Sequence, residues 1–117
     1  MSLEPTRVAA LQAVYPDARV VVDGTKEFVI LPALHIDVGD REYVLDALLL
    51  PSGGPGGYPT RLYLTQQIAE RQMIRGKAGN WTCETVAGRA WYTWSWTGVP
   101  SDLPLVDMLL AHLRALQ

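Results

Sequence analysis

The feature that most constrains this chain is a series of short apolar runs separated by tight turns between residues 19 and 65. Leu34–Val38, for example, alternates apolar with polar residues, which is the period of a strand with one buried face. Asp23-Gly24 separates two such runs, and glycine supplies the positive φ that tight hairpins need. Connections this short join antiparallel strands, because parallel strands need a crossover of a dozen or more residues. The pattern therefore predicts an antiparallel meander.

Four or so strands are expected, and the most apolar of them, Tyr43–Leu50, is expected at the centre of the sheet. A helix is predicted over Pro5–Tyr15, ended by Pro16, and a second one follows Ser101 or Asp102 as its N-cap. The runs expected to form strands are Arg19–Val22, Glu27–Leu31, Leu34–Val38, Tyr43–Leu50 and Arg61–Thr65.

Residues 81–96 contain all four tryptophans and favour β structure, but few regular elements are expected there. Dense aromatic residues can form an exposed recognition patch or can cover the meander beneath a loop, and the second arrangement is more common. The predicted fold class is α+β, with an N-terminal helix, a four-stranded antiparallel meander, an irregular aromatic-rich region and a C-terminal helix. One domain is expected over residues 1–117.

The composition excludes several classes of function. Hydrophobic residues form 49% of the chain and charged residues 19%, which is typical of a folded globule rather than of a disordered chain. The net charge is −2 and the basic residues are scattered, so no nucleic-acid partner is expected. The longest apolar run, Ala47–Leu50, is too short to cross a membrane, and the N-terminus has no apolar signal core. These features predict a soluble cytoplasmic protein.

The Gly/Pro-rich segment Pro51–Gly57 is not expected to bind phosphate. A phosphate-binding loop needs a lysine and a serine or threonine after its last glycine, at the start of a helix. Here Gly57 is followed by Tyr58-Pro59 and then by a strand. The segment is therefore interpreted as a tight connection between neighbouring strands, with Tyr58 packed inward.

Cys83 is the only cysteine, so an internal disulfide is impossible, and one cysteine with two histidines predicts no zinc site. No metal and no other cofactor is expected. A lone cysteine is more often a small buried apolar residue than a nucleophile. His35 and His112 are expected to be surface residues or residues satisfied by hydrogen bonds, although either one could approach Cys83 in space.

The order of these elements resembles the ubiquitin-conjugating enzyme superfamily, and most closely its prokaryotic family E branch. The similarity covers nearly the whole chain, and its specificity comes from order and spacing, since each motif is short. The motifs are a helix ending in Tyr15-Pro16, the meander, a Gly/Pro turn leading to Gly57-Tyr58-Pro59, the pair Trp94-Ser95, and a closing helix that contains Asp107–Leu113.

The resemblance implies a role in bacterial ubiquitin-like conjugation, with an activating enzyme and a ubiquitin-like protein as partners. It implies Cys83 as the thioester nucleophile and Asn80 as the local candidate for support of the oxyanion. The His-Pro-Asn segment of the eukaryotic relatives is missing, and Trp96-Thr97 stands where branch members carry Arg-His. Two alternatives are a catalytically inactive binding module of the same fold that docks a partner protein, and a small structural or immunity-type protein.

Overall fold

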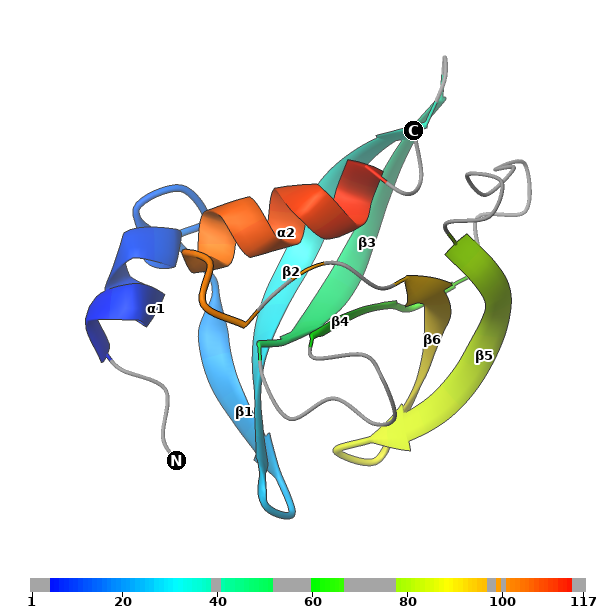
Figure 1. Cartoon of the computed structure of the whole chain (residues 1–117), viewed down its shortest axis with the longest axis horizontal. Helices are drawn as coiled ribbons and strands as arrows, with labels where there is room; N and C mark the ends of the chain where they lie inside the picture. Colours follow the sequence, from blue (N-terminus) through cyan, green and yellow to red (C-terminus); the bar gives the residue numbers. More distant parts are fainter. Residues whose placement is uncertain are drawn as a thin grey trace.

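The fold was examined in a computed structural model, which describes residues 5–38, 41–51, 60–66, 78–96, 99 and 101–114. These residues form two short helices and one six-stranded antiparallel sheet (Figure 1). The elements are α1 (Pro5–Gln12), β1 (Arg19–Asp23), β2 (Lys26–Val38), β3 (Arg41–Leu50), β4 (Arg61–Leu64), β5 (Ala78–Val86), β6 (Arg89–Trp96) and α2 (Leu105–Leu113).

The strand order is β1-β2-β3-β4-β6-β5, so the predicted meander is present but is only part of the sheet. The expectation of a four-stranded sheet followed by an irregular aromatic region was wrong. Residues 78–96 form a hairpin whose second strand, β6, pairs with β4 and leaves β5 at the end of the sheet. The interpretation of Pro51–Gly57 and of Tyr58 falls mainly on residues outside the described ranges.

The β5–β6 hairpin turns at Ala87-Gly88, between the paired residues Val86 and Arg89. Ala87 has a φ of 51° and Gly88 a φ of 78°, as a two-residue type I′ turn requires. Asparagine or aspartate usually fills the first of these positions, because alanine avoids positive φ. This turn therefore lacks the Asn-Gly or Asp-Gly pair that usually indicates a hairpin, and the sequence did not predict the β5–β6 hairpin.

β2 is a single long strand where the sequence predicted two. Its pairing with β3 shifts register between Leu31 and Leu34, and Ala33 in this bulge has a φ of 51°. The Ala33 N–H donates to Asp46 Oδ1 over 2.9 Å, and Arg89 donates to Asp46 Oδ2 over 3.1 Å. The bond from Ala33, followed by the contacts with Arg89, outweighs burial and lowers the pKa of Asp46. A carboxylate on β3 thus stabilises the bulge and links it to β6.

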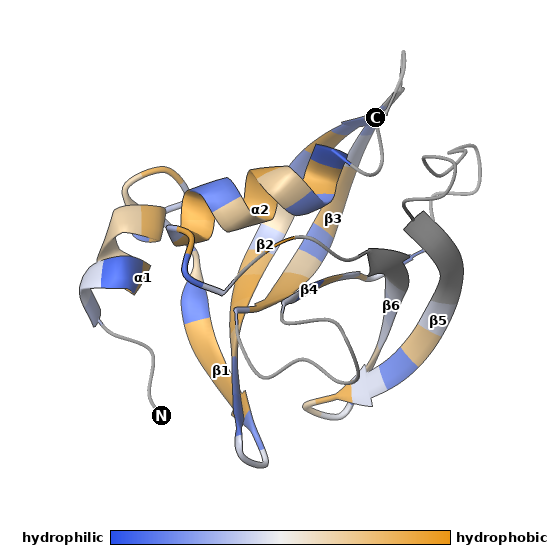
Figure 2. Ribbon diagram, in the orientation of Figure 1, coloured by the Kyte–Doolittle hydropathy of each residue, from blue (hydrophilic) through white to orange (hydrophobic). Residues whose placement is uncertain are grey.

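The two helices pack on one face of the sheet, where α2 runs across β2 and β3 (Figure 1). In α2 the buried side chains recur at helical spacing and meet the apolar faces of β2, β3 and β4 (Figure 2). Burial of this apolar surface is the main source of stability for the fold. The largest fully buried members of this cluster are Leu11, Leu31, Leu49, Leu62, Leu64, Leu105 and Met108.

The opposite face of the sheet holds a second, smaller apolar cluster. Its members are Phe28, Leu48, Leu50, Tyr63, Val86 and Trp91, with Ile30 packed against them. The tips of the first and last hairpins meet, since the Ala87 N–H donates to Asp23 Oδ2 over 2.9 Å. This contact is possible because the sheet curls, and the curl brings β1–β2 towards β5–β6 over this face.

The helices differ from their predicted ends. α1 ends at Gln12 rather than at Tyr15, and residues 13–17 continue as turns. The N-cap position of α2 is Pro104, which makes no side-chain cap hydrogen bond, so capping by Ser101 or Asp102 was a wrong prediction. Arg7 of α1 donates to the Leu103 carbonyl over 2.8 Å and so holds the two helices together. In the described part of the chain, no helix has the length and apolar character needed to span a membrane.

Candidate functional site

The predicted nucleophile, Cys83, lies in β5 and is exposed. In the register of the sheet it pairs with Tyr92 of β6, which pairs with Leu64 of β4. Because paired residues share a face, Cys83 lies on the face that the helices cover further along the sheet. β5 itself lies away from both helices (Figure 1). The thiol is therefore accessible, contrary to the expectation of a small buried residue.

The predicted oxyanion residue, Asn80, lies in the same strand. The register of β5 with β6 is irregular between Ala78 and Trp81, so Asn80 lies within a bulge. Its side chain is outside the described part of the structure. Asn80 and Cys83 are three positions apart, which corresponds to about 10 Å along an extended strand. The role of Asn80 in supporting the oxyanion beside Cys83 stays a prediction.

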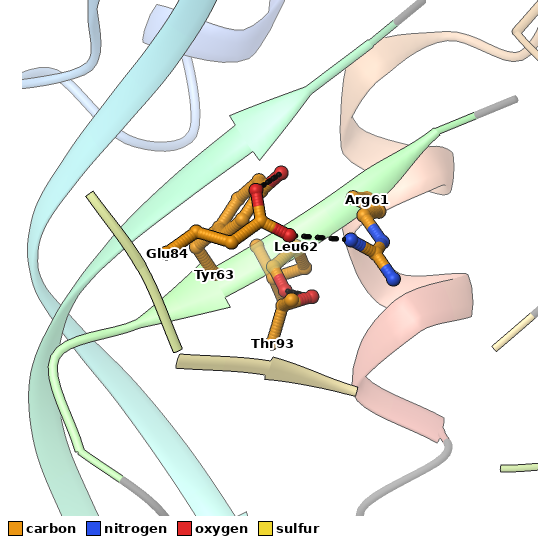
Figure 3. Close-up of polar contacts among 5 residues, drawn as sticks. All are labelled: Arg61, Leu62, Tyr63, Glu84 and Thr93. Atoms are coloured by element: carbon orange, nitrogen blue, oxygen red, sulfur yellow. Dashed lines mark hydrogen bonds and ion pairs between the residues drawn. The ribbon is translucent and has the colours of Figure 1, made fainter. Parts of the chain in front are cut away.

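Glu84 follows Cys83 in sequence but projects from the other face of β5, because successive side chains of a strand alternate. Its carboxylate Oε2 accepts a 2.7 Å hydrogen bond from Arg61 Nη1 of β4 (Figure 3). The Arg61 side chain is 8% exposed and that of Glu84 is 38% exposed. The ion pair passes over β6, which lies between the two strands. Glu84 is thus turned away from the thiol and neutralised by Arg61.

Tyr63 completes this cluster, which we call the Arg61–Tyr63–Glu84 triad. The Tyr63 hydroxyl donates to Glu84 Oε1 over 3.3 Å (Figure 3). The Tyr63 ring meets the Phe28 ring edge-on, with 6.1 Å between the ring centroids. Burial, and then the Glu84 charge, raises the pKa of Tyr63 to about 12. The phenol is therefore protonated at neutral pH and acts as a hydrogen-bond donor. Beside it, the Thr93 hydroxyl of β6 donates to the Leu62 carbonyl of β4 over 2.8 Å.

The sequence analysis did not find this triad. The one available signal was strand alternation, which places Arg61 and Tyr63 on the same face of β4. Their partner, Glu84, lies twenty-odd residues further on, in a region expected to be irregular. Because β4 and β5 are separated by β6, an ion pair between them can be predicted only when the strand order is known.

The two histidines are engaged elsewhere. His112 is 1% exposed, and its Nε2 lies 2.8 Å from the Thr60 hydroxyl, which also donates to the Val99 carbonyl over 2.9 Å. Since that hydroxyl donates its proton to Val99, Nε2 is the donor to Thr60. Burial lowers the pKa of His112 to about 4. His35 is exposed and contacts Glu42 over 3.2 Å. The expectation of satisfied or surface histidines is confirmed.

Two surface hollows are lined by described residues, and Cys83 lines neither of these two. The larger, of about 380 Å³, lies between α1 and the chain that leads into α2. The smaller, of about 210 Å³, lies beside the β2 bulge. Among the described residues, no group of three or more histidine, cysteine, aspartate or glutamate side chains could hold a metal ion. The larger hollow is lined by Thr6, Arg7, Ala10, Asp102, Leu103, Pro104 and Leu105.

Comparison of the chain with protein-family models, with curated proteins and with solved structures finds no match in any of the three. The similarity to ubiquitin-conjugating enzymes therefore depends on the sequence motifs alone.

Proposed function

We propose that this chain is a ubiquitin-conjugating-like domain that docks a ubiquitin-like protein and carries it as a thioester on Cys83. The observation that supports this proposal is the position of the thiol: exposed, outside any disulfide, and on the outermost strand of the described sheet. A thiol buried among apolar side chains could not receive a protein tail.

The chemistry is a thioester exchange. The Cys83 thiolate attacks the carbonyl carbon of the thioester between the activating enzyme and the ubiquitin-like protein. The new carbon–sulfur bond forms first and gives a tetrahedral oxyanion. When the carbonyl re-forms, the old carbon–sulfur bond breaks, the activating enzyme's cysteine leaves as a thiolate, and this thiolate takes up the proton that Cys83 lost. An acceptor amine later attacks the Cys83 thioester, forms an amide and releases the thiol.

The test is to mix the protein with an activating enzyme, its ubiquitin-like protein and ATP, and to look for a covalent adduct that thiols cleave. The adduct is expected with the unaltered chain and should be lost in Cys83→Ser. Thr85→Ser is a matched control, because Thr85 is exposed on the same face of β5. A thiol-sensitive adduct that persists in Cys83→Ser would show that Cys83 is not the acceptor.

A second candidate function is a binding module that docks the partner without carrying it covalently. The observation that favours it is the surroundings of Cys83: Glu84 is paired with Arg61, His112 with Thr60, and His35 with Glu42. Glu84 and the two histidines are thus used in structural contacts rather than directed at the thiol. Co-purification of the chain with a ubiquitin-like protein, without any adduct, would select this candidate over the first.

A further inference from the structure

In the part of the chain that the structure describes, β5 is an edge strand without the usual protection. It is the last strand of the described sheet and has nine residues, whereas β1 at the other end has five. Proteins normally protect exposed edges with lysine, proline or very short strands. Ala78–Val86 contains neither lysine nor proline, and its single charge, Glu84, is bound to Arg61. Within the described residues, no strand pairs with the outer side of β5, and this edge can accept another strand.

The hairpin geometry determines which backbone groups face outward. The two-residue turn closes on Val86 and Arg89, so this pair is hydrogen-bonded across the hairpin. Hydrogen-bonded and non-hydrogen-bonded pairs alternate along an antiparallel ladder. Val86 and Glu84 therefore direct their N–H and C=O groups to β6. Cys83 and Thr85 direct theirs to the open edge.

The side chains beside this edge permit close approach. Thr82, Cys83 and Thr85 are small, uncharged and exposed. Neighbouring strands lie about 4.8 Å apart, and small side chains on both faces place no obstacle at that distance. Within Thr82–Thr85, Glu84 is the one long side chain, and it is directed back over β6 to Arg61.

We propose that β5 pairs antiparallel with β5 of a second copy of this chain, about a two-fold axis at Cys83. The pairing joins two six-stranded sheets through the outward N–H and C=O groups of Trp81, Cys83 and Thr85, with Thr85 of each copy opposite Trp81 of the other. Any antiparallel pairing of two identical strands is self-complementary, as a closed dimer requires. This proposal goes beyond the proposed function and does not depend on thioester chemistry.

Charge and register select the position of the axis. The regular part of β5 begins at Trp81, after the bulge, and ends at Val86. An axis at Glu84 would bring two carboxylates directly opposite each other, which is unfavourable. An axis at Cys83 places Glu84 opposite Thr82 of the second copy and keeps the pairing between Trp81 and Thr85, within the regular part.

This register brings the two Cys83 residues face to face. Directly opposed residues of a hydrogen-bonded pair have Cα atoms about 5.5 Å apart. Disulfides form at Cα separations of roughly 4.4–6.8 Å. A mild oxidant such as copper phenanthroline, which takes one electron and one proton from each thiol, is expected to trap the dimer as an interchain disulfide.

The first experiment moves the thiol along the strand. The matched variant is the double substitution Cys83→Ser, Thr85→Cys, whose thiol is exposed on the same face. In the proposed register the two residues at position 85 are displaced along the strands by about 14 Å, four residues at about 3.4 Å each. Oxidation should cross-link the unaltered chain at least about tenfold faster than this variant. Equal cross-linking rates for the two proteins would mean that the thiols meet by random collision, which would overturn the proposal. The absence of any cross-linked dimer of the unaltered chain would overturn it as well.

The second experiment measures mass without any disulfide. Cys83→Ser keeps the outward backbone groups, so its mass in sedimentation equilibrium should rise towards that of a dimer with concentration. Adding Thr85→Pro removes one outward N–H and leaves the bonds to β6 intact, because proline is tolerated at edge positions of this kind. This double variant, with its fold verified by circular dichroism, should remain a monomer. A Cys83→Ser protein that is monomeric throughout would overturn the proposal, whatever the thioester assay shows.

Discussion

At the scale of single residues, Ala87 occupies a backbone conformation that its side chain disfavours. Its φ of 51° is the first half of the type I′ turn, where asparagine is preferred. Ala87→Asn should raise the free energy of unfolding by about 1 kcal/mol, because the left-handed conformation costs alanine about that much. Urea denaturation measures the change. Ala90→Asn, in the extended strand β6, is the control and should bring no gain.

Gly88, the second residue of this turn, provides a test in the opposite direction. A Cβ at this position would meet nothing within 4 Å, but the φ of 78° is unfavourable for any L side chain. Gly88→Ala should therefore lower the free energy of unfolding by about 1 kcal/mol through backbone strain alone. An unchanged urea midpoint in this variant would contradict the assignment of the turn.

His112 should make stability depend on pH. Burial lowers its pKa in the folded chain to about 4, from 6.5 when unfolded. Above pH 6.5 the residue is neutral in both states and its contribution is complete. As the pH falls from 6.5 to about 4, the unfolded chain takes up the proton first, so stability is lost at about 1.4 kcal/mol per pH unit.

His112→Gln retains an N–H donor for Thr60 but does not titrate. Urea unfolding between pH 4.5 and pH 7.5 should show a smaller fall in stability for this variant than for the unaltered chain. Asp46, whose pKa is lowered from 3.8, loses its contribution only below that window, so it does not obscure the comparison. An equally steep fall in both proteins would show that His112 is not the group responsible.

At the scale of elements, the strands that the sequence predicted are those with an apolar/polar alternation and a glycine-containing turn. Gly24 has a φ of 64° at the β1–β2 turn, and the unbroken apolar run at the end of β3, Ala47–Leu50, is buried as expected. The end of β6, Thr93–Trp96, alternates as well, but β5 does not, and Ala87-Gly88 does not resemble a hairpin signal. The density of tryptophan also favoured an irregular cover. In fact Trp91 is 2% exposed and belongs to a strand in the second cluster.

The candidate site was predictable in part. Cys83 was identified because it is the only cysteine, but its exposure follows from the position of β5 at the edge, which depends on strand order. The burial of His112 had a signal that was not used, since it stands three residues after Leu109 and four after Met108, on the buried face of α2. The Arg61–Tyr63–Glu84 triad depends on β6 lying between β4 and β5, and no local pattern encodes that arrangement.

The ion pair of the triad should stabilise the attachment of the last hairpin. Glu84→Gln leaves the nearly buried Arg61 guanidinium without its carboxylate and should lower the free energy of unfolding by about 1–2 kcal/mol, less than for a fully buried pair. Glu42→Gln is the control, because the His35–Glu42 contact is exposed and should contribute less than about 0.5 kcal/mol. Similar losses in both variants would contradict a special role for the buried pair.

At the scale of the whole molecule, the sheet is buried on both faces rather than on one. The helices cover one face, while the curl that joins Asp23 to Ala87 closes the other over Phe28, Tyr63 and Trp91. A helix–meander–helix arrangement would have only the first core. In this fold β6 and β5 extend the sheet far enough to enclose a second one.

Two neighbouring leucines of β3 test this arrangement, because they point into different cores. Leu49 lies in the helix-covered cluster and Leu48 in the second, and both are at most 1% exposed. If both faces are packed interiors, Leu48→Ala and Leu49→Ala should each lower the free energy of unfolding by about 2–5 kcal/mol, through lost burial and the cavity that remains. Val44→Ala, at a position that is 52% exposed on the same strand, should change it little. A loss in Leu48→Ala no larger than that in Val44→Ala would mean that the sheet has a single core, beneath the helices.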